Sequence, residues 1–345
     1  MRHVEPGITM ALASLCLQAG AVNAQTETDR PQVTIVATGG TIANSPAGRM
    51  GVDAFLEQIP GIGDVADIKI RDYARINSSN MTVQNWIEIA QLITDELAEY
   101  PETDGIVVTH GSNTSEETAF FLNLVLDTEK PVVVVGAQRQ RTLLSEDGSR
   151  NLYDAVRVAA YPDARGHGVL LVVNEMIHAA RDVTKTLSYR TDTWDSGDLG
   201  ALGLVDIDRI RIYRTPTSRH TVNSALRLNG VTQAADLPRV DIVYTYADAG
   251  GELIDAAVAA GAQGIVVAGF PTGTPAPAMT TALEQAEASG VTIAMSHRGG
   301  RGRVQTGRPF PSADNLTPQK ARILLMLALA NGATRDTLEE VFLSY

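Results

Sequence analysis

Short runs of β-branched residues alternate along the first half of the chain with longer stretches of helical spacing. The runs are VTIVATGG at 33–40, GIVVTHG at 105–111, VVVVGAQ at 132–138 and GVLLVVN at 168–174. Near-continuous Val/Ile runs of this length are typical of parallel strands buried on both faces. Residues 86–100 and 116–126 predict helices, and Thr114 followed by Glu117 predicts a capping box at the start of the second. The pattern predicts an α/β fold, with a mostly parallel sheet flanked by helices.

The alternation stops at 205–238, where charged and turn-forming residues predict a closing strand and then an interdomain linker. A second α/β unit follows, with strands at 240–246, 264–270 and 291–296 and helices near 252–260 and 278–289. Thr317 and Pro318 predict an N-cap and first turn for a helix that continues through Ala330. We therefore divide the chain into a large N-terminal α/β catalytic domain at 32–213, a linker at 214–238 and a smaller C-terminal α/β domain at 239–345.

The N-terminus has the layout of a secretory signal peptide. An apolar run at 8–22 follows Arg2 and His3, and small residues at Val22 and Ala24 precede a polar stretch that begins with Gln25. The run is too short to span a bilayer as a mature helix. We expect cleavage after Ala24, so that residues 1–24 are removed and the protein is periplasmic or secreted, with no membrane attachment afterwards. The alternative is a disordered or buried N-terminal helix.

Composition narrows the function classes. The 345 residues carry a formal net charge of −12, which disfavours a protein that coats nucleic acid, because that function needs a basic surface. The single cysteine, Cys16, can form neither an internal disulfide nor a cysteine-based zinc site. The six histidines lack metal-ligand spacing, so no metal site is predicted. The first βα turn has neither the GxGxxG nor the P-loop pattern, so it carries no sequence signature of a dinucleotide- or nucleotide-binding site.

Three predicted strand ends carry polar and glycine residues, at 38–41, 109–114 and 136–139. In open α/β sheets, ligands bind beyond the carboxyl ends of strands. Ser112 lies just before a helix N-terminus, where free N–H groups favour an oxyanion. Lys185 is the candidate that activates a hydroxyl, because burial can lower the pKa of a lysine. Each of these residues also has an alternative interpretation without catalysis: the threonines could stabilise turns, Ser112 could cap the helix, and Lys185 could be solvated. We expect His110 to be a hydrogen-bonded core histidine.

Together these segments resemble the bacterial L-asparaginase/glutaminase family. The matching segments, in chain order, are ATGGTIA (37–43), THGSNTSEETA (109–119), VGAQR (135–139), EDGSRNLYDAV (146–156) and ARDVTKT (180–186), with weaker matches at 216–221 and 316–329. The resemblance implies a large N-terminal domain, a smaller flavodoxin-like C-terminal domain and a homotetramer built from intimate dimers. It also implies active sites between the N-terminal domain of one subunit and the C-terminal domain of its neighbour, without a metal or organic cofactor.

The same resemblance assigns roles to residues of the motifs. Thr41 matches the nucleophilic threonine, Ser112 a second catalytic threonine, and Lys185 its lysine partner. Ser78 falls on the serine that binds the substrate α-carboxylate. The further substrate-binding candidates are Gly40, Ser79, Gly111, Asn113 and Asp248. The implied reaction is hydrolysis of the asparagine side-chain amide to aspartate and ammonia, through attack by a hydroxyl and an acyl-enzyme.

The departures from the family pattern fall on the substrate contacts. The family has Thr-Asp where this chain has Ser112-Asn113, and a longer glutamine where this chain has Ser79. The segment 44–55 lacks the tyrosine of the family's mobile loop, and 297–307 offers no clear match to its glutamate. Asp248 stands where the family usually has asparagine. We hypothesise that the carboxylate has changed sides, so that Asn113 and Asp248 together restore the charge count; the alternative is a solvated loop acid.

A second hypothesis concerns the arginines of the glycine-rich loop, Arg298, Arg301 and Arg303. They could recognise an extra carboxylate on a larger substrate, or they could belong to an exposed surface loop. For the whole chain, three functions remain open. The leading one is an exported amidohydrolase acting on asparagine, and on glutamine as a possible second substrate. The others are an amidase of the same fold whose amide substrate lacks an α-ammonium group, and a non-catalytic solute-binding homologue.

Overall fold

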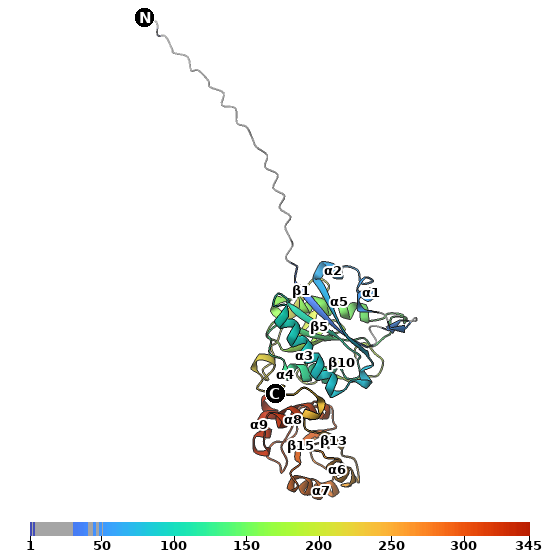
Figure 1. The fold of residues 1–345 in the computed structure, drawn as a ribbon, viewed down its shortest axis with the longest axis vertical. Coiled ribbons are helices and arrows are strands. Elements are labelled where there is room, and N and C mark those ends of the chain that lie inside the picture. The colour runs from blue at the N-terminus through green and yellow to red at the C-terminus, as the bar shows by residue number, and fades with distance from the viewer. Residues whose placement is uncertain (2, 4–29, 41–43, 46–47, 50) are drawn as a thin grey trace.

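The computed structural model describes residues 1, 3, 30–40, 44–45, 48–49 and 51–345. Most of the expected signal peptide, including the cleavage position after Ala24, lies outside the described residues, and so does Thr41. The described chain forms two α/β domains, with the larger N-terminal one above the smaller C-terminal one in Figure 1. This agrees with the fold class expected from the alternation of buried strands and amphipathic helices.

An eight-stranded sheet forms the centre of the N-terminal domain. Its order is β12-β11-β8-β7-β6-β5-β1-β4. The strands β4, β1, β5, β6 and β7 run parallel, whereas β8, β11 and β12 pair antiparallel at one edge. The bounds are β1 Gln32–Gly39, β4 Asp67–Ile76, β5 Gly105–Thr109, β6 Val132–Val135, β7 Val169–Val173, β8 Met176–Ala179, β11 Gly203–Val205 and β12 Ile210–Ile212. Two small hairpins, β2 Asn44–Ser45 with β3 Gly48–Arg49 and β9 Thr184–Lys185 with β10 Trp194–Asp195, lie outside this sheet.

The central strands β1, β5, β6 and β7 of this sheet are buried on both faces. On β5, the side chain of Val107 belongs to one core and those of Ile106 and Val108 to the other. The helices α1 (Val52–Leu56), α2 (Ile62–Val65) and α5 (Gly148–Ala159) complete the first core, and α3 (Val83–Glu99) and α4 (Ser115–Val125) complete the second. Successive side chains of a strand point to opposite faces, so uninterrupted Val/Ile runs are the expected consequence.

The C-terminal domain repeats this three-layer plan on a smaller scale. Its parallel sheet has the order β13-β14-β15, at Val240–Tyr244, Gly264–Gly269 and Thr292–His297. The helices α6 (Glu252–Ala259) and α7 (Pro277–Ala288) cover one face. The other face packs against α8 (Pro318–Ala330), which also joins the core that contains α3 and α4, with α9 (Arg335–Ser344) beside it. Helix α8 is therefore shared by the two domains.

Two expectations about local structure have different outcomes. The helix predicted from Thr317 and Pro318 is confirmed, because α8 begins at Pro318 and ends at Ala330. The capping box predicted from Thr114 and Glu117 is wrong. Helix α4 does begin after Thr114, but the Thr114 hydroxyl donates to the carbonyl oxygen of Ser78, 2.7 Å away, instead of accepting the cap bond. A tertiary partner has replaced the local one.

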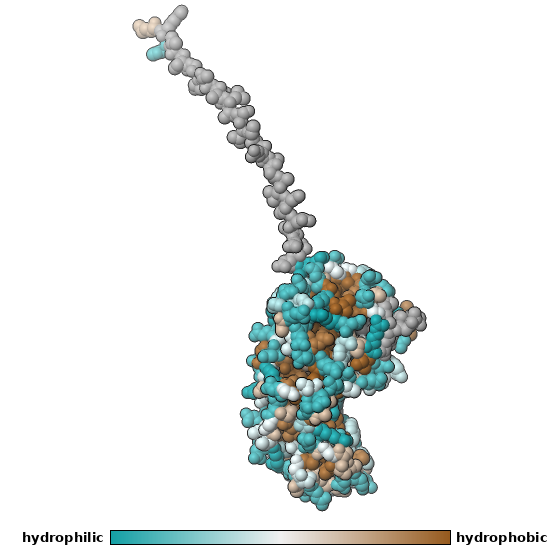
Figure 2. All heavy atoms as spheres, in the orientation of Figure 1, coloured by the Kyte–Doolittle hydropathy of each residue, from teal (hydrophilic) through white to brown (hydrophobic). Residues whose placement is uncertain are grey.

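Residues 203–212 form the antiparallel edge strands β11 and β12 of the large sheet, and the segment that follows contains two short 3-10 helices at Thr221–Asn223 and Ala234–Asp236. The division at 214–238 stays a prediction. Two further 3-10 turns lie at Ser78–Asn80 and Pro162–Ala164. Figure 2 shows a largely polar face on which apolar side chains gather in each domain. In the described part of the chain, no helix is both long and apolar enough to cross a membrane.

One buried ionic cluster ties β1 and β4 to α3. The Glu96 side chain is 1 % exposed and accepts a hydrogen bond from the Thr34 hydroxyl at 2.9 Å. It also pairs with Lys69 at 2.8 Å and Arg71 at 2.6 Å. Burial by itself would raise the pKa of the Glu96 carboxyl, but the hydrogen bonds from Lys69, Arg71 and Thr34 bring the pKa below its usual value. This acid therefore contributes to stability as a carboxylate.

Candidate active site

The carboxyl ends of the neighbouring strands β1 and β5 bring two glycines into close contact. Gly40 follows β1 with φ +92°, and a Cβ atom at this residue would lie 2.5 Å from the backbone nitrogen of Gly111. A Cβ atom at Gly111 would lie 2.5 Å from Oγ of Ser78. Because real Cβ atoms do not approach backbone this closely, glycine at position 40 is a packing requirement. Three segments that are distant in sequence thus meet at one edge of the sheet.

Ser112 and Lys185 lie within hydrogen-bond distance at this edge. Nζ of Lys185 donates to Oγ of Ser112 at 2.8 Å. Ser112 is buried, at 8 % exposure, and Lys185 is half-buried at the end of β9. Burial lowers the pKa of the Lys185 amine below its usual value, while the negative charge of Glu116 opposes this effect. A lysine with a lowered pKa in contact with a serine hydroxyl can act as a general base toward that hydroxyl.

Ser78 connects the loop before α3 to the start of α4. Its Oγ accepts a hydrogen bond from the backbone N–H of Asn113 at 3.2 Å, and its side chain is buried. The neighbouring Ser79 is exposed, and so is the Asn113 side chain. Ser78 therefore lies inside the site, whereas Ser79 and Asn113 lie where solvent reaches them.

A buried hydrogen-bond chain fixes the strand end beneath the site. His110 is fully buried, with Nδ1 2.7 Å from the carbonyl oxygen of Gly111 and Nε2 2.9 Å from Oγ1 of Thr118. The indole N–H of Trp86 donates to the same Thr118 oxygen at 2.8 Å. The threonine hydroxyl therefore donates to Nε2, which we assign from this network as the unprotonated ring nitrogen. Burial lowers the pKa of His110 to about 4, partly opposed by the bond to Gly111, so the ring is neutral. The expectation of a hydrogen-bonded core histidine is confirmed.

The motif at 146–156 holds the third strand end in place. The Asp147 carboxylate accepts hydrogen bonds from the backbone N–H groups of Gln138 and Arg139, the shortest at 2.8 Å. Nδ2 of Asn151 donates to that carboxylate and to the carbonyl oxygen of Gly136. These contacts close the loop after β6 against the first turn of α5. The motif thus shapes the rim of the site through backbone contacts.

Asp248 is placed apart from the other site candidates within one chain. It follows β13 in the C-terminal domain, is exposed, and has φ +62°. A positive φ is uncommon for a residue with a side chain, although aspartate tolerates it better than most. Among the described residues, the hydrogen bonds and ion pairs that join Ser78, Ser112 and Lys185 do not include Asp248. Its role in the site stays a prediction.

The arginine-rich loop is held by partners in this chain. Arg298 donates to the carbonyl oxygen of Thr245 at 3.0 Å and stacks over the Phe270 ring. Arg301 pairs with Asp195 of the N-terminal domain, and Arg303 pairs with Asp314 at 3.0 Å. Since all three guanidinium groups have partners, the geometry favours a surface loop over recognition of an extra substrate carboxylate. In the described part of the chain, no cluster of three His, Cys, Asp or Glu side chains could hold a metal ion.

Sequence reasoning missed the residues that support Lys185. Oε2 of Glu116 accepts the backbone N–H of Lys185 at 2.6 Å, and Oε1 accepts Nε2 of Gln319 at 2.6 Å. Nζ of Lys320 donates to the carbonyl oxygens of Arg181 and Val183, which precede Lys185. Glu116 lies in the motif at 109–119 and in the first turn of α4, where acidic residues are common for reasons unrelated to catalysis. No local pattern connects residues 319 and 320 with residues 181–185, so this signal exists only in three dimensions.

Comparison with known proteins agrees with this arrangement. The family model "Asparaginase, N-terminal" matches residues 32–218, and the model "Glutaminase/Asparaginase C-terminal domain" matches residues 239–342. L-asparaginase 2 of Bacillus subtilis is 39 % identical over 343 residues, which cover 95 % of this chain and 90 % of that protein. A probable periplasmic L-asparaginase of Haemophilus influenzae is 38 % identical over 346 residues, covering 95 % and 97 % of the two chains.

A solved structure is similar over nearly the whole fold. The crystal structure of a probable cytoplasmic L-asparaginase from Campylobacter jejuni has a TM-score of 0.87 and 38 % sequence identity, and the match covers 92 % of this chain and all of that chain. Similarity of this extent in sequence and in structure covers both domains. The chain therefore belongs to the asparaginase family and is an L-asparaginase-like amidohydrolase.

Proposed function

We propose that the protein hydrolyses the side-chain amide of L-asparagine to aspartate and ammonia, and that glutamine is the second substrate to test. The observation that carries this proposal is the 2.8 Å contact between Nζ of Lys185 and Oγ of Ser112 at the sheet edge where Gly40 and Gly111 meet. An amine with a lowered pKa beside a buried hydroxyl supports catalysis, because it can take up the hydroxyl proton.

The proposed reaction has two steps and uses two hydroxyl groups, those of Thr41 and Ser112. In the first step, a hydroxyl attacks the amide carbon, backbone N–H groups hold the oxyanion, and ammonia leaves with the transferred proton. In the second step, water opens the acyl-enzyme ester and releases aspartate. Lys185 accepts the proton of Ser112 and returns it, so the amine must be neutral when the hydroxyl is activated.

The substrate contacts in this proposal come from two chains. Ser78 binds the α-carboxylate, with Ser79, Asn113 and the backbone at Gly40 and Gly111 around it. Asp248 of the partner subunit supplies the carboxylate that pairs with the α-ammonium group. Its exposure and left-handed backbone support a role outside its own chain.

Exposed apolar residues next to Asp248 support an interface between subunits. Ile242, Tyr244 and Tyr246 lie along and just after the edge strand β13, and each is between 38 % and 51 % exposed. Large apolar side chains on an unpaired strand edge are typical of a surface that another chain covers. We propose a homotetramer of intimate dimers, and light scattering after gel filtration would measure its mass.

The decisive experiment is a coupled ammonia assay over asparagine, glutamine and amides with a blocked α-amino group. We expect Thr41→Ala, Ser112→Ala and Lys185→Met each to lower kcat by at least about 100-fold, the range for a missing nucleophile or general base. Thr281→Ala, an exposed change on α7, is the matched control and should keep wild-type kinetics. Full activity in Lys185→Met would refute the proposed mechanism.

A second candidate rests on the exposed amide of Asn113, where the family pattern has a carboxylate. An amidase of the same fold would then act on amides without an α-ammonium group. Asp248→Asn separates the two candidates, since loss of a charged partner should raise KM for asparagine at least tenfold. An unchanged KM for asparagine, together with faster turnover of blocked amides, would favour the second candidate.

Export is part of the proposal as well. The two compared relatives with a location in their names differ, one being called periplasmic and one cytoplasmic. We propose cleavage after Ala24 and a periplasmic or secreted mature enzyme. Mass spectrometry of the expressed full chain should find a mature N-terminus at Gln25. An intact N-terminus in a cytoplasmic fraction would overturn this part alone.

A further inference from the structure

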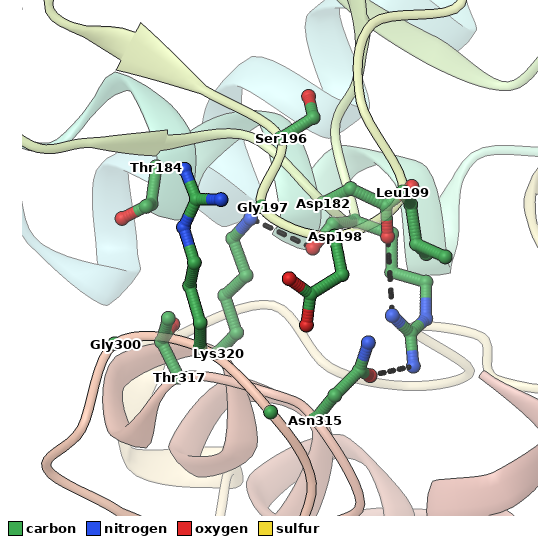
Figure 3. A pocket seen from close by; sticks show the side chains of 13 residues that line it. Asp182, Thr184, Ser196, Gly197, Asp198, Leu199, Gly300, Asn315, Thr317 and Lys320 are labelled. Carbon is green, nitrogen blue, oxygen red and sulfur yellow. Dashed lines mark hydrogen bonds and ion pairs between the residues drawn. The ribbon is translucent and has the colours of Figure 1, made fainter.

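Hydrogen bonds from the C-terminal domain of the same chain hold the segment that precedes Lys185. Residues 180–183 connect β8 to β9, which ends at Lys185, and Lys320 of α8 extends toward this connection (Figure 3). The Lys320 side chain is 1 % exposed, and its Nζ donates to the carbonyl oxygens of Arg181 at 2.8 Å and Val183 at 2.5 Å. The backbone two residues before Lys185 is therefore fixed by a buried amine from the other domain.

Gln319, the neighbour of Lys320 on α8, is linked to Lys185 through the side chain of Glu116. Nε2 of Gln319 donates to Oε1 of Glu116, and Oε2 of the same carboxylate accepts the backbone N–H of Lys185, each at 2.6 Å. Glu116 is 6 % exposed. With both oxygens engaged, the carboxylate cannot rotate without breaking a bond, and Lys185 is held at its own backbone nitrogen.

We propose that Gln319 and Lys320 are positioning residues that set the approach of Lys185 to Ser112, so that α8 completes the active site within its own chain. This rests on the proposed function, in which Lys185 activates Ser112. The partner's C-terminal domain would contact the substrate, whereas the chain's own C-terminal domain would hold the base. A displacement of about 1 Å in a catalytic group can reduce the rate about 100-fold, so such support is functional.

These polar contacts are not needed to hold the two domains together, because apolar packing already does so. The side chains of Ile323, Leu324, Leu325 and Leu327 of α8 are fully buried in the core that includes α4. Burial of these four apolar side chains is by itself enough to dock the helix. A buried ammonium group adds a desolvation cost that an apolar residue would not have. What the polar residues add is a fixed geometry for the loop.

The charges around Lys185 allow position and electrostatics to be tested separately. The charge of Glu116 on α4 acts on the Lys185 amine. The charges that act on Lys320 of α8 are those of Glu116 and Glu117 from α4 and of Arg181 and Asp182 from the connection before β9. Glu116→Gln keeps an oxygen for the Lys185 N–H, and the Gln319 amide can turn so that its own oxygen accepts from the new NH2 group. The change removes the charge that raises the Lys185 pKa. Its geometry should survive, so kcat at the optimum should stay within about threefold. Because the base must be neutral, the acid limb of the kcat profile should move to lower pH.

Gln319→Leu and Lys320→Met test position. Each should lower kcat by about 10- to 100-fold with KM changed less than about twofold, since the amine is displaced while the substrate contacts remain. Asn331→Ala is the control at the opposite end of the same helix, because Asn331 is the C-cap of α8 and its side chain bonds to Arg227 and to the carbonyl oxygen of Leu327. It should keep wild-type kcat and KM.

A crystal structure of Gln319→Leu gives a readout that does not depend on turnover. We expect Nζ of Lys185 to lie beyond hydrogen-bond distance of Oγ of Ser112. If this separation appears but the wild type hydrolyses no amide, the proposed function fails and the positioning role stands. If the wild type is active and Gln319→Leu keeps both kcat and the Lys185–Ser112 contact, the positioning role is overturned. If Lys320→Met does not fold, Gln319→Leu still tests the positioning role.

Discussion

Replacing Gly40 with alanine should destabilise the protein and reduce its activity, through two separable effects. The first is backbone strain, because Gly40 has φ +92°. The second is a steric overlap, because the new Cβ atom would lie 2.5 Å from the nitrogen of Gly111 and 2.6 Å from the carbonyl carbon and oxygen of His110. These atoms are backbone, so they cannot swing aside as the end of a side chain would.

Gly290 offers a control that carries only the first effect. Its φ is +96°, nearly the same as that of Gly40, and a Cβ atom there would meet nothing within 4 Å. Left-handed backbone costs an alanine about 1–2 kcal/mol, so Gly290→Ala should lower the free energy of unfolding by that amount. The overlap in Gly40→Ala should add about 1–3 kcal/mol, the range for an overpacked site. The expected total for Gly40→Ala is about 2–5 kcal/mol.

Urea unfolding at one protein concentration would compare the two variants, and ammonia release would compare their activity. Gly290→Ala should keep wild-type kcat, since it lies at the end of α7 in the C-terminal domain. Gly40→Ala should lose at least about tenfold in kcat, because relief of the overlap must move the backbone next to Ser112. Equal stability of the two variants, within about 0.5 kcal/mol, and equal activity would refute the close approach of β1 to the Gly111 backbone.

Three further outcomes follow from the buried polar groups. Thr118→Val, which leaves His110 and Trp86 without their shared partner, should lower the free energy of unfolding by about 2–4 kcal/mol in thermal or urea unfolding. Glu96→Gln should cost about 2 kcal/mol at pH 7. A carboxylate with a lowered pKa stabilises above its unfolded value of 4.5, so this difference should shrink in unfolding curves recorded below that pH. Burial lowers the pKa of Lys320 from 10.5 to about 8, so the unfolded chain binds more protons between these values. The stability of the wild type relative to Lys320→Met should therefore rise with pH across that window, by up to about 3 kcal/mol.

Most of the strand and helix framework could be predicted because its signals are local. The runs at 105–111 and 132–138 contain buried strands, and the Thr317-Pro318 pair marks the start of a helix in the structure. The strand β4 was missed because its side chains are mostly half-buried and include charged residues of the Glu96 cluster. Its place at the sheet edge explains that composition, since an edge strand has one neighbour and a partly solvated surface.

The site divides in a similar way. The meeting of Ser112 with Lys185 could be anticipated from the family resemblance, which pairs the two residues. The rule that ligands bind at the carboxyl ends of parallel strands pointed to Ser112 alone, because Lys185 lies on β9, outside the large sheet. The contributions of Glu116, Gln319 and Lys320 could not be anticipated, because they depend on how α8 docks against α4. The predicted capping box was wrong because of another tertiary contact, in which the Thr114 hydroxyl donates to the carbonyl oxygen of Ser78. The roles of Thr41 and Asp248 stay predictions.

The placement of Glu116 bears directly on whether Lys185 can act as a base. A carboxylate paired with the amine itself would stabilise the charged form and keep the proton on the lysine. Instead, Glu116 bonds to the backbone nitrogen of Lys185, while Nζ points to Ser112. None of the ion pairs between described residues includes the Lys185 amine. The carboxylate thus holds the residue at its backbone end, and at the amine end burial lowers the pKa by more than the charge of Glu116 raises it. This arrangement gives both a fixed position and a lowered pKa, whereas a direct ion pair would stabilise the charged amine.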